Sequence, residues 1–115
     1  MRPGQFEREV RAALAEIPPE WARLLREVPI LVADEPDETL TSAEELFGLF
    51  EGASLAERAA GHAYDPPRIT IYRKPLQRAF RGRERRKREI RRTVIHEIMH
   101  YVGGEERDMP RFGLD

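Results

Sequence analysis

The sequence predicts an α+β fold in which helices pack against a small twisted sheet and a long helix lies near the C-terminus. Two observations lead to this class: four segments have the apolar spacing or end signals of helices, and only two short segments have the pattern of strands. The predicted order is helix, helix, strand, helix, strand, helix. The chain has 115 residues, the length of one ordinary domain, so residues 1–115 are expected to form a single domain.

The N-terminal part, residues 1–27, is predicted to form two packing helices. The first covers residues 4–16, where apolar side chains recur at helical spacing; they are Phe6, Val10, Ala13, Leu14 and Ile17. The pair Pro18–Pro19 interrupts this pattern, and proline suits the first turn of a new helix. The second helix follows with its own apolar stripe, which consists of Trp21, Leu24, Leu25 and Val28.

Two segments are predicted to be strands. The apolar run "VPILVAD" at residues 28–34 ends in turn-forming residues, which is typical of a short buried strand. In "RITIYRK", residues 68–74, Ile69 and Ile71 alternate with polar side chains, which indicates a strand with one buried face. Pro75 is expected to end that strand.

The segment between the strands is predicted to be a helix over residues 41–52, "TSAEELFGLFEG". Thr41 with Glu44, or Ser42 with Glu45, has the spacing of a capping box, and the helix is expected to end at Gly52. Residues 53–58 are ambiguous.

The last predicted helix covers residues 83–102 and ends at Gly103 and Gly104. It contains the sequence His-Glu-Ile-Met-His at residues 96–100. Residues four apart lie on one face of a helix, so His96 and His100 can bind one metal ion together. Glu97 follows His96 and has the position of a general base toward a metal-bound water. The pattern therefore predicts one zinc ion per chain, with Glu97 catalytic.

Two histidines need a third ligand, and the residues that could supply it are Glu105, Glu106, Asp108 and His62. Glu106 has the best spacing, because it lies ten residues after His96 and beyond the glycines at the helix end. Carboxylate oxygen is an accepted zinc donor. Glu105 and Asp108 remain alternatives, whereas His62 lies in a loop without ligand spacing and is interpreted as a surface histidine.

The stretch "HEIMHYVGGEE" resembles the zincin metallopeptidases, and residues 28–110 resemble the minimal zincin-like metallopeptidase family of small bacterial proteins. This resemblance implies peptide-bond hydrolysis of a peptide or protein substrate, with Glu106 as an acidic third ligand. It also implies that the C-terminal subdomain is missing, because Met109 lies too close to Glu106 to form a methionine turn. The activity is therefore expected to be weak. By the same resemblance, residues 68–73 are expected to be an edge strand that pairs with substrate.

Charge and composition limit the other classes of function. Twenty Lys and Arg oppose 21 Asp and Glu, so the net charge of −1 gives no overall attraction to nucleic acid, which is not an expected partner. No apolar run is long enough for a signal peptide or membrane span, so no membrane contact and a cytoplasmic location are expected. Cysteine is absent. The sequence does not specify an oligomeric state.

One segment supports an alternative function. Residues 81–92 hold seven arginines and one lysine against two glutamates, and residues 34–57 hold eight acidic residues and no base. The basic helix is expected to face the acidic segment in part. The alternative is a catalytically weak or inactive binding module, in which the basic helix contacts a partner or nucleic acid.

Overall fold

The computed structural model describes residues 4–40, 46–61 and 65–103, and it confirms the α+β class. Its elements along the chain are α1 (Gln5–Ala15), the 3₁₀ turn η1 (Pro19–Trp21), α2 (Ala22–Glu27), β1 (Ile30–Ala33), the 3₁₀ turn η2 (Glu38–Leu40), β2 (Gly48–Glu51), α3 (Leu55–Ala59), β3 (Arg68–Tyr72), α4 (Arg73–Ala79) and α5 (Arg83–Val102). The two N-terminal helices, both predicted strands and the long helix at 83–102 are thus confirmed. The expected burial of the first strand is wrong, because β1 lies at an edge of the sheet and its residues are half-buried or, at Leu31, exposed. No helix in these ranges is long and apolar enough to cross a bilayer.

The sheet has the strand order β1-β3-β2, with β3 in the centre. Strand β1 pairs with β3 in parallel, and β2 pairs with β3 antiparallel. The prediction that residues 68–73 form an edge strand is therefore wrong. Ile69 and Ile71 are fully buried, and both edges of β3 are occupied by neighbouring strands. A strand with such buried side chains suits the middle of the sheet, where a neighbouring strand pairs with each of its edges.

The prediction of a helix over residues 41–52 is also wrong where the structure describes that segment. Residues 48–51 form β2, while residues 41–45, including the expected capping boxes, lie outside the described part. A short apolar run does not distinguish a helix from a strand by its period, and Gly48 disfavours a helix. Pairing with β3 decides in favour of the strand. A capping box does occur in the ambiguous segment, where Ser54 and Glu57 cap α3.

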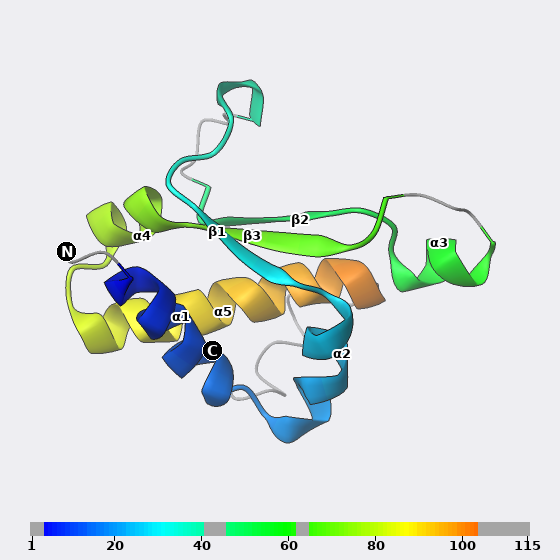
Figure 1. The fold of residues 1–115 in the computed structure, drawn as a ribbon, viewed down its shortest axis with the longest axis horizontal. Helices are drawn as coiled ribbons and strands as arrows, with labels where there is room; N and C mark the ends of the chain where they lie inside the picture. The colour runs from blue at the N-terminus through cyan, green and yellow to red at the C-terminus, as the bar shows by residue number, and fades with distance from the viewer. Residues whose placement is uncertain (1–3, 41–45, 62–64, 104–115) are drawn as a thin grey trace.

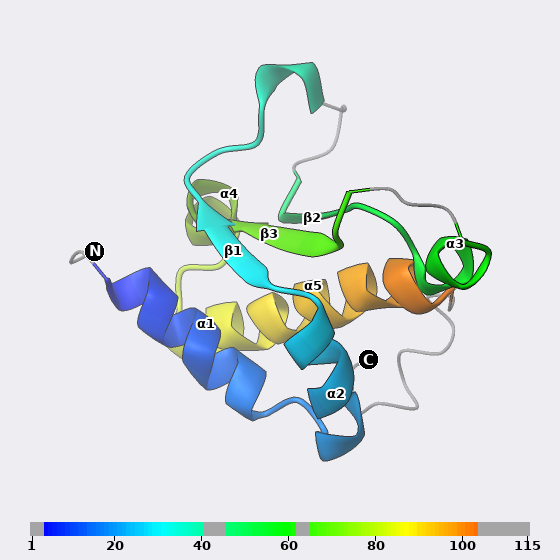
Figure 2. The same ribbon diagram turned by 45° about the vertical axis from the view of Figure 1, so that its right-hand side comes forward.

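Helix α5 lies along one face of the sheet, and α1 packs against its N-terminal half (Figure 1). The view in Figure 2 shows the sheet on one side of α5 and the N-terminal helices on the other. Five side chains of α5 have no exposed surface, and they are Ile90, Val94, Ile95, Ile98 and Tyr101. The core is therefore built around α5, which fixes the rotation of this helix about its own axis.

The start of α4 explains how the chain leaves the sheet. Strand β3 ends at Tyr72, before Pro75, and α4 begins at Arg73. Pro75 thus lies in the first turn of a helix that the sequence did not predict, where a missing N–H costs nothing. The turn directs the chain back toward the beginning of α5.

Candidate metal centre

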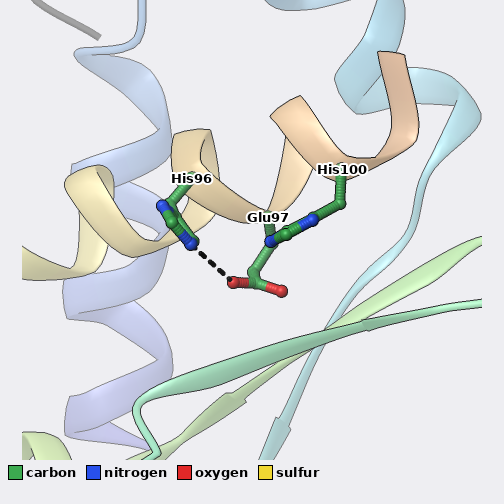
Figure 3. Close-up of side chains that lie close together, drawn as sticks. All are labelled: His96, Glu97 and His100. Carbon is green, nitrogen blue, oxygen red and sulfur yellow. Dashed lines mark ion pairs between the residues drawn. The ribbon is translucent and has the colours of Figure 1, made fainter. Parts of the chain in front are cut away.

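The side chains of His96, Glu97 and His100 converge at one point on α5. One ligand atom from each lies within 4.8 Å of the others. The two imidazole rings have centroids 5.1 Å apart, and His96 Nε2 lies 3.8 Å from Glu97 Oε2. All three side chains point to the same side of the helix, toward the sheet (Figure 3). The two imidazoles are donors that zinc accepts, and the carboxylate lies beside them, so the arrangement fits a bound ion with a neighbouring base.

The surrounding residues of α5 explain this orientation. Ile95, Ile98 and Tyr101 are fully buried, whereas His96 is half-buried and His100 is exposed. The apolar side chains hold the helix so that the histidines come to the margin of the core. Helix α5 ends at Gly103, which has a φ of 81° that favours glycine, so the chain turns shortly after His100.

Glu97 is the buried member of the cluster, with 8% of its surface exposed. Burial raises the pKa of its carboxyl group, because the charged form loses solvation. The N–H of Phe50 and the nearby imidazoles act in the opposite direction and lower the pKa of Glu97, but burial has the largest effect. The carboxyl group therefore holds a proton more readily than an exposed glutamate.

A backbone group of β2 also holds Glu97. The N–H of Phe50 donates a hydrogen bond of 2.8 Å to Glu97 Oε1. In the antiparallel pair of β2 and β3, the N–H of Tyr72 donates to the carbonyl of Phe47, so the backbone groups of Phe47 face β3. Every second residue of a strand faces the same neighbour, so the backbone groups of Leu49 also face β3. The alternate residues, Gly48 and Phe50, direct theirs away from β3. The carboxylate of Glu97 thus lies at the outer edge of β2.

Tyr101 connects the end of the site helix with three other elements. Its hydroxyl accepts a hydrogen bond of 2.6 Å from Arg58 of α3 and donates one of 3.2 Å to Glu27 of α2. Its ring centroid lies 5.8 Å from that of Phe50 in β2. These contacts fix the last turn of α5, which carries His100, relative to the strand that holds Glu97.

The structure brings His96, Glu97 and His100 together, as the spacing predicts. The candidates for the third ligand, Glu105, Glu106, Asp108 and His62, lie outside the described residues, so their assignment stays a prediction. Sequence reasoning missed the role of the Phe50 backbone. A side-chain pattern gives no signal for it, because an N–H becomes available only when the strand and its register are known.

Comparison with known families gives one match. The model of a family described as zincin-like metallopeptidase matches residues 25–114, which is most of the chain. The matched range contains the three strands and α5 with its histidines. Comparison with curated proteins finds no match.

Proposed function

Because the chain belongs to the zincin-like metallopeptidase family, we propose that it hydrolyses peptide bonds with one zinc ion per chain. The observation that carries this proposal is the convergence of two imidazoles and a carboxylate within 4.8 Å on one face of α5. His96 and His100 are the proposed histidine ligands, and Glu97 is the proposed general base.

The donor set suits a catalytic ion more than a structural one. Catalytic zinc sites have three protein ligands and keep one position open. In the proposal, Glu106 is the third ligand, with Glu105 and Asp108 as alternatives close to it in sequence. Zinc at such a site lowers the pKa of its water ligand to about 7, so hydroxide is available near neutral pH.

Glu97 is suited to accept a proton. Its Oε1 is engaged by the N–H of Phe50, and its Oε2 faces His96 Nε2 at 3.8 Å. Oε2 is therefore the oxygen available to a reacting water between the carboxylate and the imidazoles. A general base works best when its pKa is not far below the working pH, and the burial that raises the pKa of Glu97 acts in that direction.

The proposed substrate is an extended segment of a peptide or protein. Gly48 and Phe50 direct backbone groups to the outer edge of β2, where the N–H of Phe50 is bound to Glu97 and the carbonyl of Phe50 and the groups of Gly48 are left for a substrate strand. An extended peptide can add to such an edge through main-chain hydrogen bonds. The sequence predicts that residues 68–73 pair with the substrate, but this strand lies in the centre of the sheet. We therefore assign the pairing with substrate to the edge strand β2.

The test is hydrolysis of an unstructured peptide library by the zinc-loaded chain, with a chelated sample as the control. Glu97→Gln keeps the shape of the side chain and its bond to Phe50 but removes the base. A general base contributes roughly 10²–10⁴ in rate, so we expect at least a ~100-fold loss with unchanged zinc binding. The proposal fails if the zinc-loaded parent cleaves nothing that the chelated parent leaves intact.

That negative outcome would favour the non-catalytic binding module. Part of the basic segment already has partners inside the molecule: Arg86 pairs with Glu9, and Lys87 and Arg91 both pair with Glu16. Exposed arginines remain in the segment for a partner to contact; they are Arg81, Arg83, Arg85, Arg88 and Arg92. Pull-down with these arginines replaced would then test the alternative.

A further inference from the structure

The hydrogen bond between Phe50 and Glu97 joins residues 47 positions apart, and it connects the edge of the sheet with the site helix. The donor is a backbone N–H, so its position is set by the pairing of β2 with β3 and not by a rotatable side chain. The acceptor is a flexible glutamate that loses rotamer freedom when it is ordered. The N–H of Phe50 therefore restrains the carboxylate of Glu97, which would otherwise be free to rotate.

We propose that the backbone N–H of Phe50 is a positioning group, which holds Oε1 of Glu97 so that Oε2 faces the histidines. This inference rests on the proposed function and deepens it, because it assigns the orientation of the base to the edge strand. The 2.8 Å bond to Oε1 and the 3.8 Å approach of Oε2 to His96 Nε2 are the two distances that define this orientation.

The packing of Phe50 also holds β2 in the position that the hydrogen bond to Glu97 requires. The register places Phe50 opposite Ile69, which is fully buried, and the Phe50 ring lies near that of Tyr101. The pairing restrains β2 relative to β3, and the ring contact restrains it relative to α5. A shift of β2 by one residue would exchange inward and outward backbone groups, so the N–H of Phe50 would no longer reach Glu97.

Amide hydrogen exchange of the full-length chain tests the bond without any need for activity. An N–H at a strand edge is protected only while it has an acceptor. We expect Phe50 to be protected in the parent and in Glu97→Gln, which retains an acceptor oxygen. In Glu97→Ala its exchange should rise roughly tenfold to 100-fold, the range expected for loss of a hydrogen bond to a charged group.

The amide of Leu49, which faces β3, is the internal control and should not change. The inference is overturned if Phe50 exchanges at the same rate in the parent and in Glu97→Ala. It is also overturned if Leu49 accelerates equally, because β2 would then have loosened as a whole.

Kinetics on the zinc-loaded chain tests the consequence. Phe50→Pro removes the N–H at an outward position of an edge strand, where proline is tolerated, and Phe50→Ala measures the cost of losing the ring alone. We expect kcat to be at least about tenfold lower in the proline variant than in the alanine variant, with similar KM, because orientation of the base affects the chemical step. Equal kcat values would contradict the inference. If the parent is inactive, the proposed function fails, and the exchange experiment still decides whether the bond exists.

Discussion

His96, Glu97 and His100 differ in exposure, and this difference separates their proposed roles. The two histidines lie at the margin of the core, half-buried and exposed, where an ion can enter. Glu97 is buried and hydrogen-bonded by the backbone, so its carboxylate cannot swing freely into solvent. An accessible pair of imidazoles suits metal binding, and a restrained carboxylate suits proton transfer at a defined place.

His100→Ala should reduce the zinc content of the purified chain from one ion to well below one. The reason is that a single histidine on α5 would be left to share the ion with an acidic residue. Elemental analysis of untagged protein measures the stoichiometry. His62→Ala is the matched control and should keep the parent value. Equal zinc content in parent and His100→Ala would refute the site.

Glu106→Ala should weaken zinc affinity by orders of magnitude, whereas Glu105→Ala should change it little. The physical reason is that a ligand removed from a three-residue site leaves too few donors to compete with water. Competition with a fluorescent chelator measures both affinities. A stronger effect from Glu105→Ala, or from Asp108→Ala, would move the third ligand to that residue.

At the scale of elements, strand β2, at the edge of the sheet, lies very close to helix α5, and Gly48 makes this approach possible. A Cβ atom built on Gly48 would come within 2.6 Å of Thr93 Cγ2 and within 3.2 Å of the Thr70 carbonyl. Glycine at this position therefore lets the strand lie directly on the helix. The bond from Phe50 to Glu97, two residues further along β2, depends on that approach.

Gly48→Ala should destabilise the fold by about 1–2 kcal/mol, since the overpacking cost exceeds the gain from replacing glycine in a strand. Thr93→Ser removes the methyl group that the new Cβ would meet and keeps the hydroxyl that donates to the Glu89 carbonyl. In urea denaturation the double variant should lose less stability than the sum of the two single losses. Strict additivity would show that the close approach is unimportant.

At the scale of the whole molecule, ion pairs hold α1 against α5. Arg86 and Glu9 are each 5% exposed, and the guanidinium donates two hydrogen bonds of 2.9 and 2.5 Å to the carboxylate. Arg86 also donates to the carbonyl groups of Phe80 and Arg81, between α4 and α5. The expectation that the basic helix faces residues 34–57 is thus wrong for Arg86, which pairs with Glu9 of α1, and for Lys87 and Arg91, which pair with Glu16 at the end of α1. Asp34 and Glu35 instead pair with Arg73 and Arg78 of α4.

Glu9→Ala should reduce the free energy of unfolding by about 3 kcal/mol or more, because it leaves a buried guanidinium without its counter-ion. Glu16→Ala, which removes an exposed carboxylate that pairs with Lys87 and Arg91, is the matched control and should cost clearly less. Chemical denaturation of both variants gives the comparison. If the two losses are equal, the buried pair has no special part in holding α1 on α5.

The sequence alone determined the parts of this protein that depend on local spacing. Helix α5 has the predicted bounds, because its apolar period and its terminal Gly103 are local signals. His96 and His100 share a face for the same reason, since four residues of helix bring them together wherever the helix packs. The stripe of α1 is likewise buried at Phe6, Val10 and Ala13, as its spacing predicts.

Only the tertiary structure decided which strand has the outer edge beside the site. The apolar run at residues 46–50 is compatible with a helix or a strand, and pairing with β3 selects the strand. The same pairing makes β3 central and turns the N–H of Phe50 toward Glu97. Strand order and backbone direction arise from contacts between residues far apart in the chain, and no local pattern of side chains encodes them.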